Sequence, residues 1–114
     1  MKKITALCTF LLLTFTSYSQ ISPIGGKWWG ILDVGGRKLT IGFDINANEG
    51  QGFMEVKEQG AKGIPMDVRK VTADSLDILI SSIGASYSGI RVAQDKIDGT
   101  FTQNGMKLTL SLQP

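Results

Sequence analysis

Two serines lie in a glycine-bounded segment that approaches, without matching, the sharp turn that presents the nucleophile of many serine hydrolases. The segment 84–89 reads Gly-Ala-Ser-Tyr-Ser-Gly, so Ser88 stands where the G-x-S-x-G pattern requires a second glycine. A serine nucleophile also needs a neighbouring base, usually histidine, and the sequence contains no histidine. We therefore expect Gly84–Gly89 to form a turn and the start of a strand, not a catalytic elbow.

Metal-ligating residue types are also scarce. Zinc and most transition metals bind imidazole or thiolate, but the chain has no histidine and a single cysteine, Cys8. Four residues follow the spacing of a calcium-binding loop: Asp44, Asn46, Asn48 and Glu55. Glu49 occupies the position where that loop requires glycine, and Asn-rich hairpin turns produce the same spacing. We expect a turn here, with no metal and no cofactor.

Carboxylates are the remaining candidates for acid–base chemistry. Sequence alone does not pair the acidic residues that fall on predicted strands: Asp33, Asp44, Glu55, Asp67 and Asp77. Whether the chain has an enzymatic activity of its own is therefore left open. The residue types favour a non-catalytic role, since nucleophile, base and metal ligands all lack candidates.

The first 19 residues have the pattern of a secretory signal peptide. Lys2 and Lys3 precede an apolar stretch from Ile4 to Phe15, and small residues at 17 and 19 prepare a cleavage site before Gln20. The apolar stretch is too short to span a membrane. Lipid attachment at Cys8 is disfavoured because the most apolar residues follow the cysteine. We expect export to the periplasm or the extracellular space, without stable membrane insertion.

Removing residues 1–19 from the 114-residue chain leaves 95 residues, the length of one small domain spanning 20–114. The two lysines at the start account for the whole excess of basic residues, so this domain carries ten basic and ten acidic side chains. A neutral balance gives no electrostatic footprint for nucleic acid. The domain also has no cysteine, so its stability must come from packing rather than disulfides.

The elements that position these residues are short strands. Between closely spaced glycines, apolar and polar residues alternate with period two, as in Leu39, Ile41, Phe43 and Ile45. Asn104-Gly105 is the dipeptide typical of a two-residue hairpin turn. The pattern predicts eight strands, at 26–34, 37–46, 51–58, 64–71, 75–81, 85–93, 96–103 and 106–113.

Eight consecutive strands with tight turns favour an all-β fold, a small antiparallel up-and-down barrel or barrel-like meander similar to a lipocalin. An open two-sheet sandwich is the alternative. A barrel of eight strands is either filled by side chains or holds one small ligand, and this short chain favours a filled interior. The aromatic residues expected to line it are Trp28, Phe43, Phe53, Tyr87 and Phe101.

Four stretches carry a resemblance to a known family: Ile24–Leu32, Gln59–Pro65, Ile83–Gly89 and Ile97–Gly105. In their order and spacing, they resemble the β-rich N-terminal accessory domain that precedes the catalytic domain in secreted α/β-hydrolases of Bacteroidetes. The resemblance runs from about Ile21 to Leu112. The family usually has Ser-Pro-Asp before its Gln-Gly-Ala, where this chain has Val56-Lys57-Glu58.

The resemblance implies a non-catalytic exported module whose partner is a serine hydrolase domain. That domain would follow in the same chain if the sequence is part of a longer protein, or bind in trans otherwise. Trp28 and Trp29 are adjacent and must face opposite sides of a strand, so Trp29 faces outward if Trp28 shares the core with Leu32. We expect the partner to contact Trp29, Gln59, Gly60, Lys62 and Pro65. The alternative is a small lipocalin-like protein that binds an apolar ligand inside the barrel.

Overall fold

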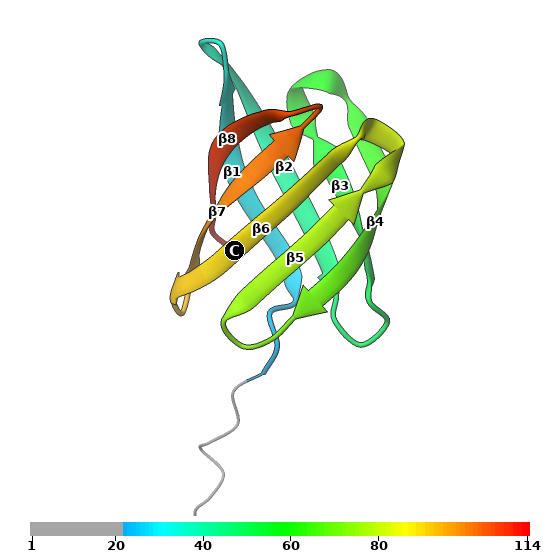
Figure 1. Cartoon of the computed structure of the whole chain (residues 1–114), viewed down its shortest axis with the longest axis vertical. Helices are drawn as coiled ribbons and strands as arrows, with labels where there is room; N and C mark the ends of the chain where they lie inside the picture. The colour runs from blue at the N-terminus through cyan, green and yellow to red at the C-terminus, as the bar shows by residue number, and fades with distance from the viewer. Residues whose placement is uncertain (1–21) are drawn as a thin grey trace, which may run out of the picture.

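The structure, a computed structural model, describes residues 22–114 and is built almost entirely from strands (Figure 1). The predicted segment 1–19 lies outside the described residues. Two short 3₁₀ helices, η3 (Lys57–Gln59) and η4 (Ser81–Ile83), interrupt the strands. The strands are β1 (Gly26–Val34), β2 (Arg37–Asn46), β3 (Gln51–Val56), β4 (Ala61–Val71), β5 (Ser75–Ile80), β6 (Ala85–Ala93), β7 (Lys96–Gln103) and β8 (Met106–Leu112).

The eight strands form one sheet in sequence order, each antiparallel to the next. The sheet curls until its first and last strands meet, and Trp29 exchanges two backbone hydrogen bonds with Gln113, at 2.6 and 2.8 Å. These are the bonds that join the two edges, so the barrel is nearly closed (Figure 1). The predicted up-and-down barrel is therefore confirmed, and the two-sheet sandwich is not observed.

The main differences from the predicted strands occur around the glycine-rich connection 59–65. The strand predicted at 51–58 ends at Val56, where η3 begins, and β4 starts at Ala61 instead of 64. Gly60 and Gly63 both have the positive φ that the turn requires, 63° and 65°. Ala61–Pro65 nevertheless pairs with β3, with a register shift between Met54 and Val56. This connection is thus a 3₁₀ turn followed by a bulged strand.

The core consists of side chains that point inward from alternate positions of every strand. Trp28, Phe43, Tyr87 and Phe101 are all buried, and the rings of Phe43 and Tyr87 lie 5.4 Å apart. Phe53, also expected inside, is 55% exposed, so that prediction is wrong. Its neighbours Gly52 and Met54 face the core, and alternation then places Phe53 on the outer face.

Tyr87 fills the centre of the barrel against a pair of glycines. Gly89 and Gly99 are opposite each other on β6 and β7, and a Cβ atom on either would lie within 3 Å of the Tyr87 hydroxyl oxygen. The hydroxyl donates a hydrogen bond of 2.8 Å to the carbonyl oxygen of Leu110 on β8. Burial raises the pKa of this phenol well above its ordinary value, with a smaller contribution from the Asp98 charge.

One end of the barrel, the lower end in Figure 1, is closed by the chain that precedes β1. Ile24 is buried and its amide donates to the carbonyl oxygen of Thr72, at 2.9 Å. Trp28 is only 3% exposed, and its indole Nε1 donates to the carbonyl oxygen of Gly25, at 3.0 Å. The Arg91 guanidinium lies 5.7 Å from the centre of the Trp28 ring. We call this the plugged end.

Candidate functional site

The opposite end of the barrel contains an apolar cavity of about 290 Å³. It lies among the β1–β2 hairpin, η3 and η4, which form the upper rim in Figure 1, and we call this the open end. The lining residues are Leu32, Val34, Arg37, Leu39, Ile41, Met54, Val56, Gln59, Ile64, Ile83, Phe101 and Gln103. Side chains therefore fill the lower and central parts of the interior, as expected for a filled barrel. The cavity at one end differs from that prediction.

The cavity exists because no segment of residues 22–114 covers the inward-facing side chains at the rim. Deeper residues such as Ile41 and Phe101 are fully buried, at 1% and 2% exposure, and form its floor. Leu39, Ile64 and Ile83 stand nearer the rim and are only partly buried. At the plugged end, Ile24 and Trp28 occupy the corresponding place. The barrel is accordingly closed at one end and has a mostly apolar cavity at the other.

Three polar side chains line the cavity: Arg37, Gln59 and Gln103. The amide Nε2 of Gln103 donates to the carbonyl oxygen of Ile83, at 3.0 Å, and so ties β7 to η4. Arg37, the first residue of β2, is exposed and forms no ion pair with any of residues 22–114. A guanidinium is thus available at the rim.

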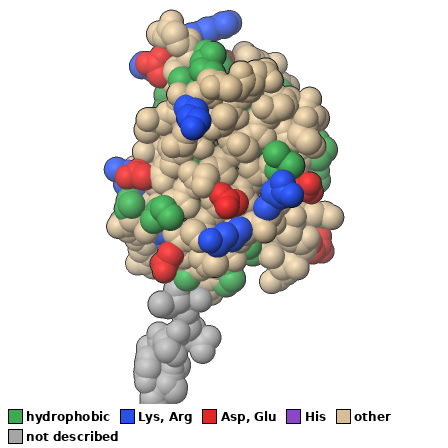
Figure 2. All heavy atoms as spheres, in the orientation of Figure 1, with side chains coloured by type: hydrophobic (Ala, Val, Ile, Leu, Met, Phe, Trp, Pro, Cys, Tyr) green, Lys and Arg blue, Asp and Glu red, His purple; other side chains and the backbone are tan. Residues whose placement is uncertain are grey.

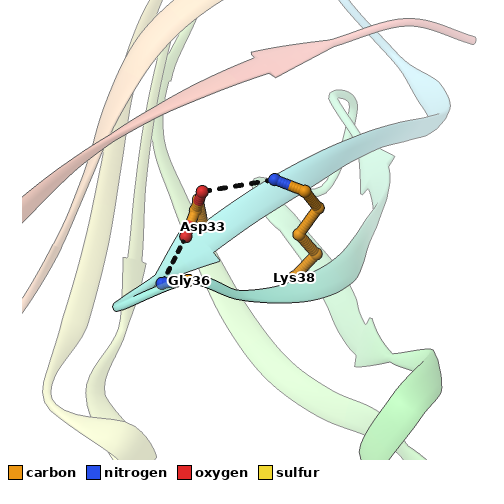
Figure 3. A network of polar contacts seen from close by, with 3 residues as sticks. All are labelled: Asp33, Gly36 and Lys38. Carbon is orange, nitrogen blue, oxygen red and sulfur yellow. Dashed lines mark hydrogen bonds and ion pairs between the residues drawn. The ribbon is translucent and has the colours of Figure 1, made fainter.

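The hairpin that carries Arg37 is stabilised by the neighbouring Asp33 (Figure 3). One carboxylate oxygen of Asp33 accepts the Gly36 amide at 2.8 Å, and the other is 3.3 Å from the Lys38 ammonium. These contacts, the backbone hydrogen bond first, lower the pKa of Asp33. Lys38 therefore has a counter-ion close by, while the charge of Arg37 stays uncompensated at the rim.

A second carboxylate attaches η3 to the barrel wall. Glu58 accepts hydrogen bonds from the Thr40 amide at 2.6 Å and from the Thr40 hydroxyl at 2.7 Å. The two bonds, again with the backbone bond first, lower the pKa of Glu58. η3 is thereby fixed against β2, and Gln59 in the same turn lines the cavity.

Trp29 lies on the outer face, as alternation with the buried Trp28 predicts. Its ring covers Gly42, the residue opposite on β2, where a Cβ atom would lie 2.5 Å from the ring. The ammonium groups of Lys27 and Lys57 are 5.0 and 4.6 Å from the ring centre. Lys27 also pairs with Glu55 at 3.1 Å. The indole thus lies against Gly42, with two ammonium groups close to its ring.

A shallow groove of about 510 Å³ runs beside Trp29 along the seam where β1 meets β8. Ile31, 54% exposed, contributes an apolar side chain to it. The groove is lined by Trp29, Gly30, Ile31, Thr40, Thr109, Ser111, Gln113 and Pro114. Trp29 and the last residues of the chain therefore belong to one surface, which we call the seam groove.

The other residues expected to share a contact surface with Trp29 lie elsewhere. Gln59 lines the cavity, and Gly60 follows it as the left-handed residue that ends η3. Lys62 is exposed on β4, and Pro65 is paired with Phe53, away from the seam groove. From that region, the side chain that the structure brings to Trp29 is Lys57. Which side chains lie near Trp29 depends on the register of β1, β2 and β3, and the sequence does not show that register.

The serines and the carboxylate considered for catalysis and metal binding contribute to strand pairing and to an ion pair. Ser86 and Ser88 are strand residues of β6, opposite Thr102 and Thr100 of β7. Glu55, from the calcium-like spacing, pairs with Lys27. Within residues 22–114, no three His, Cys, Asp or Glu side chains are grouped closely enough to hold a metal ion. The same part of the chain has no helix with the length and apolar character needed to span a bilayer.

The surface charge follows the neutral composition. On the face seen in Figure 2, basic and acidic side chains are interspersed and do not gather into a patch of one sign. A further hollow of about 610 Å³ lies outside the plugged end, with Asp74 of the β4–β5 turn and Arg91 of β6 among its lining residues. Comparison of the chain with models of protein families, with curated proteins and with solved structures found no match.

Proposed function

We propose that the chain is an exported, non-catalytic β-barrel module that packs against a serine hydrolase domain. The resemblance along residues 21–112 supports the nature of the partner. The observation that carries the contact surface is the seam groove, where Trp29 and Ile31 lie beside the last residues, Gln113 and Pro114. A domain joined after Pro114 would lie next to this groove, and a domain bound in trans would find the same apolar side chains.

The seam groove has the composition of a contact surface. Tryptophan is enriched at the energetic centres of protein interfaces because it buries a large apolar area at low entropic cost. Here the indole is already fixed by Gly42 beneath it and by two lysines, so binding a partner would cost little further ordering. The threonine and serine hydroxyls around the groove supply a polar rim.

The proposal is tested first by the native state of the exported polypeptide, detected with an antibody against residues 20–114. A fluorophosphonate probe, which labels activated serines, is applied to the same fraction. We expect the antibody to detect a labelled chain several times larger than the barrel, or a barrel-sized chain that co-purifies with a labelled protein. Recovery of the barrel with no fluorophosphonate-labelled protein, attached or bound, would contradict the proposal.

The contact surface is tested by the affinity between the separately expressed barrel and hydrolase domain. Replacing Trp29 by alanine should weaken binding by about tenfold or more, as expected for a central interface aromatic. Phe53→Ala is the matched control, because Phe53 is another aromatic residue of the outer face but does not line the groove. Equal affinities for wild type and Trp29→Ala would place the interface elsewhere.

A second candidate function is binding of a small apolar molecule inside the barrel. The observation that favours it is the open-end cavity, which is concave, mostly apolar and equipped with a few polar groups, as ligand sites commonly are. Its volume falls near the lower limit of such sites. The two functions are compatible, since the cavity and the seam groove are formed by different surfaces of the barrel.

A further inference from the structure

The size of the open-end cavity limits what it can hold. An apolar cavity of about 150 Å³ is large enough to bind benzene. The open-end cavity, at about 290 Å³, has nearly twice that volume. It therefore accommodates about a dozen non-hydrogen atoms of flexible hydrocarbon. Because the plugged end closes the barrel below it, a linear chain can enter only from the rim.

The charge at the rim limits the chemistry of the ligand's exposed end. Among the described residues, Arg37 is the charged residue that lines the cavity, and no carboxylate of residues 22–114 lines it. The nearest described acid on the same hairpin, Asp33, is engaged by Gly36 and Lys38 (Figure 3). A guanidinium recognises a carboxylate through two parallel hydrogen bonds. The rim is therefore complementary to an anion attached to an apolar chain.

We propose that the open-end cavity binds a medium-chain carboxylate, a free fatty acid of about eight to ten carbons. The acyl chain lies between Leu39, Ile64 and Ile83 with its end toward Phe101, and the carboxylate meets Arg37 at the rim. The inference rests on the second candidate function and is independent of the hydrolase partner.

Decanoate binding to the purified protein tests the site, with the methyl NMR signals of the protein as the readout. Signals of Leu39, Ile64 and Ile83 should shift on titration, and those of Ile24 and Leu76, buried far from the cavity lining, should not. Affinity should fall by about fourfold for each methylene removed, the value of one buried methylene group. Shifts confined to the plugged end or to the outer face would overturn the assignment.

Arg37→Gln tests the head group. The variant should bind decanoate about three- to fivefold more weakly, because the ion pair at the rim is exposed to solvent. Arg69→Gln is the matched control, since Arg69 is an exposed arginine of β4 that does not line the cavity. Decanol, which has the same chain without the charge, should bind wild type more weakly than decanoate and should bind Arg37→Gln as it binds wild type.

The outcomes separate this inference from the function on which it rests. If decanol and decanoate bind wild type equally in the cavity, ligand binding stands and the carboxylate assignment is wrong. If neither binds, both are wrong. Ile64→Phe, which adds volume inside the cavity, should abolish binding while the remaining methyl spectrum keeps its dispersion. Val92→Phe, an enlargement at an exposed residue that does not line the cavity, should leave binding unchanged. Full binding by Ile64→Phe would overturn the proposal.

Discussion

The two ends of the barrel are built from the same kind of strand but finished in different ways. At the plugged end, Ile24 and Trp28 are buried, and Arg91 lies against the indole. At the open end, Leu39, Ile64 and Ile83 stay partly exposed around a hollow. A few residues before the first strand thus decide whether an end of the barrel contributes to stability or remains available for binding.

The two ends differ because the segment before β1 packs across one of them, whereas the other is formed by connections between strands. Within residues 22–114, only the plugged end has a segment that is not part of a hairpin, and its Ile24 reaches the β4–β5 turn through the hydrogen bond to Thr72. The open end has hairpin connections and two 3₁₀ turns. Glu58 of η3 accepts a hydrogen bond from Thr40 of β2, and Gln103 of β7 donates one to Ile83 of η4. Those contacts shape the rim without filling it.

The largest expected effect is at the plugged end. Trp28→Ala should lower the free energy of unfolding by about 3–5 kcal/mol, the usual result of truncating a buried tryptophan. Denaturant-induced unfolding followed by far-UV circular dichroism measures the change. A loss below about 1 kcal/mol would mean that Trp28 is not part of the plug and that the two ends do not differ in stability.

A smaller effect is expected in the centre, where Tyr87 separates the two ends. Tyr87→Phe removes the hydroxyl that bonds to the buried carbonyl oxygen of Leu110, which should cost about 1–3 kcal/mol. The folded-state pKa of Tyr87 is raised, so the stability associated with the neutral phenol is present below about pH 10 and is lost at higher pH.

Alkaline unfolding of wild type and of Tyr87→Phe provides the check. Tyr87 is the only tyrosine of residues 20–114, so a tyrosinate absorbance change when the wild-type protein unfolds reports on this group. We expect stability to fall less steeply above pH 10 in Tyr87→Phe than in wild type. Identical slopes would contradict a raised pKa.

The fold could be predicted to a large extent because the signals that specify it are local. Alternation with period two places Trp28, Phe43 and Tyr87 inside, and Asn104-Gly105 forms the predicted hairpin turn, with φ values of 50° and 87°. The errors occurred where two local signals compete. The aromatic side chain of Phe53 favours the interior, but the alternation set by the buried Met54 puts it on the outer face. Gly60 and Gly63 are typical of a loop, yet β4 begins at Ala61, which pairs with Val56 of β3.

The candidate sites could be predicted much less well, because they depend on contacts between distant residues. The outward direction of Trp29 follows from its position next to Trp28. Its contact with Lys57, 28 residues away, depends on the register of β1, β2 and β3. The cavity has no sequence signal, since it arises from where η3 and η4 turn. Arg37 carries no sequence signal of a binding site either, because single arginines beside hairpin turns are common.

At the open end, truncation should cost less than at the plugged end. Leu39→Ala and Ile83→Ala each remove a partly buried side chain that borders an existing hollow, so each should lower the free energy of unfolding by about 1 kcal/mol. Urea denaturation of both variants beside Trp28→Ala makes the comparison. A loss as large as that of Trp28→Ala would mean that the cavity is closed in solution and that the open end is packed like the plugged one.

The smallest expected effect is an acid-dependent loosening confined to the open end. The pKa values of Asp33 and Glu58 are both lowered, so the stability that their hydrogen bonds supply is present above the ordinary carboxyl pKa values and is lost as the pH falls through the lower folded-state values. The Gly36 and Thr40 amide protons, which bond to these carboxylates, should titrate in NMR spectra with midpoints below the ordinary pKa values of Asp and Glu side chains. The amide of Ile24, whose acceptor is the carbonyl oxygen of Thr72, should not follow them. If the Ile24 amide titrated together with Gly36 and Thr40, the whole barrel would loosen as one unit, and the distinction between its two ends would not hold in acid.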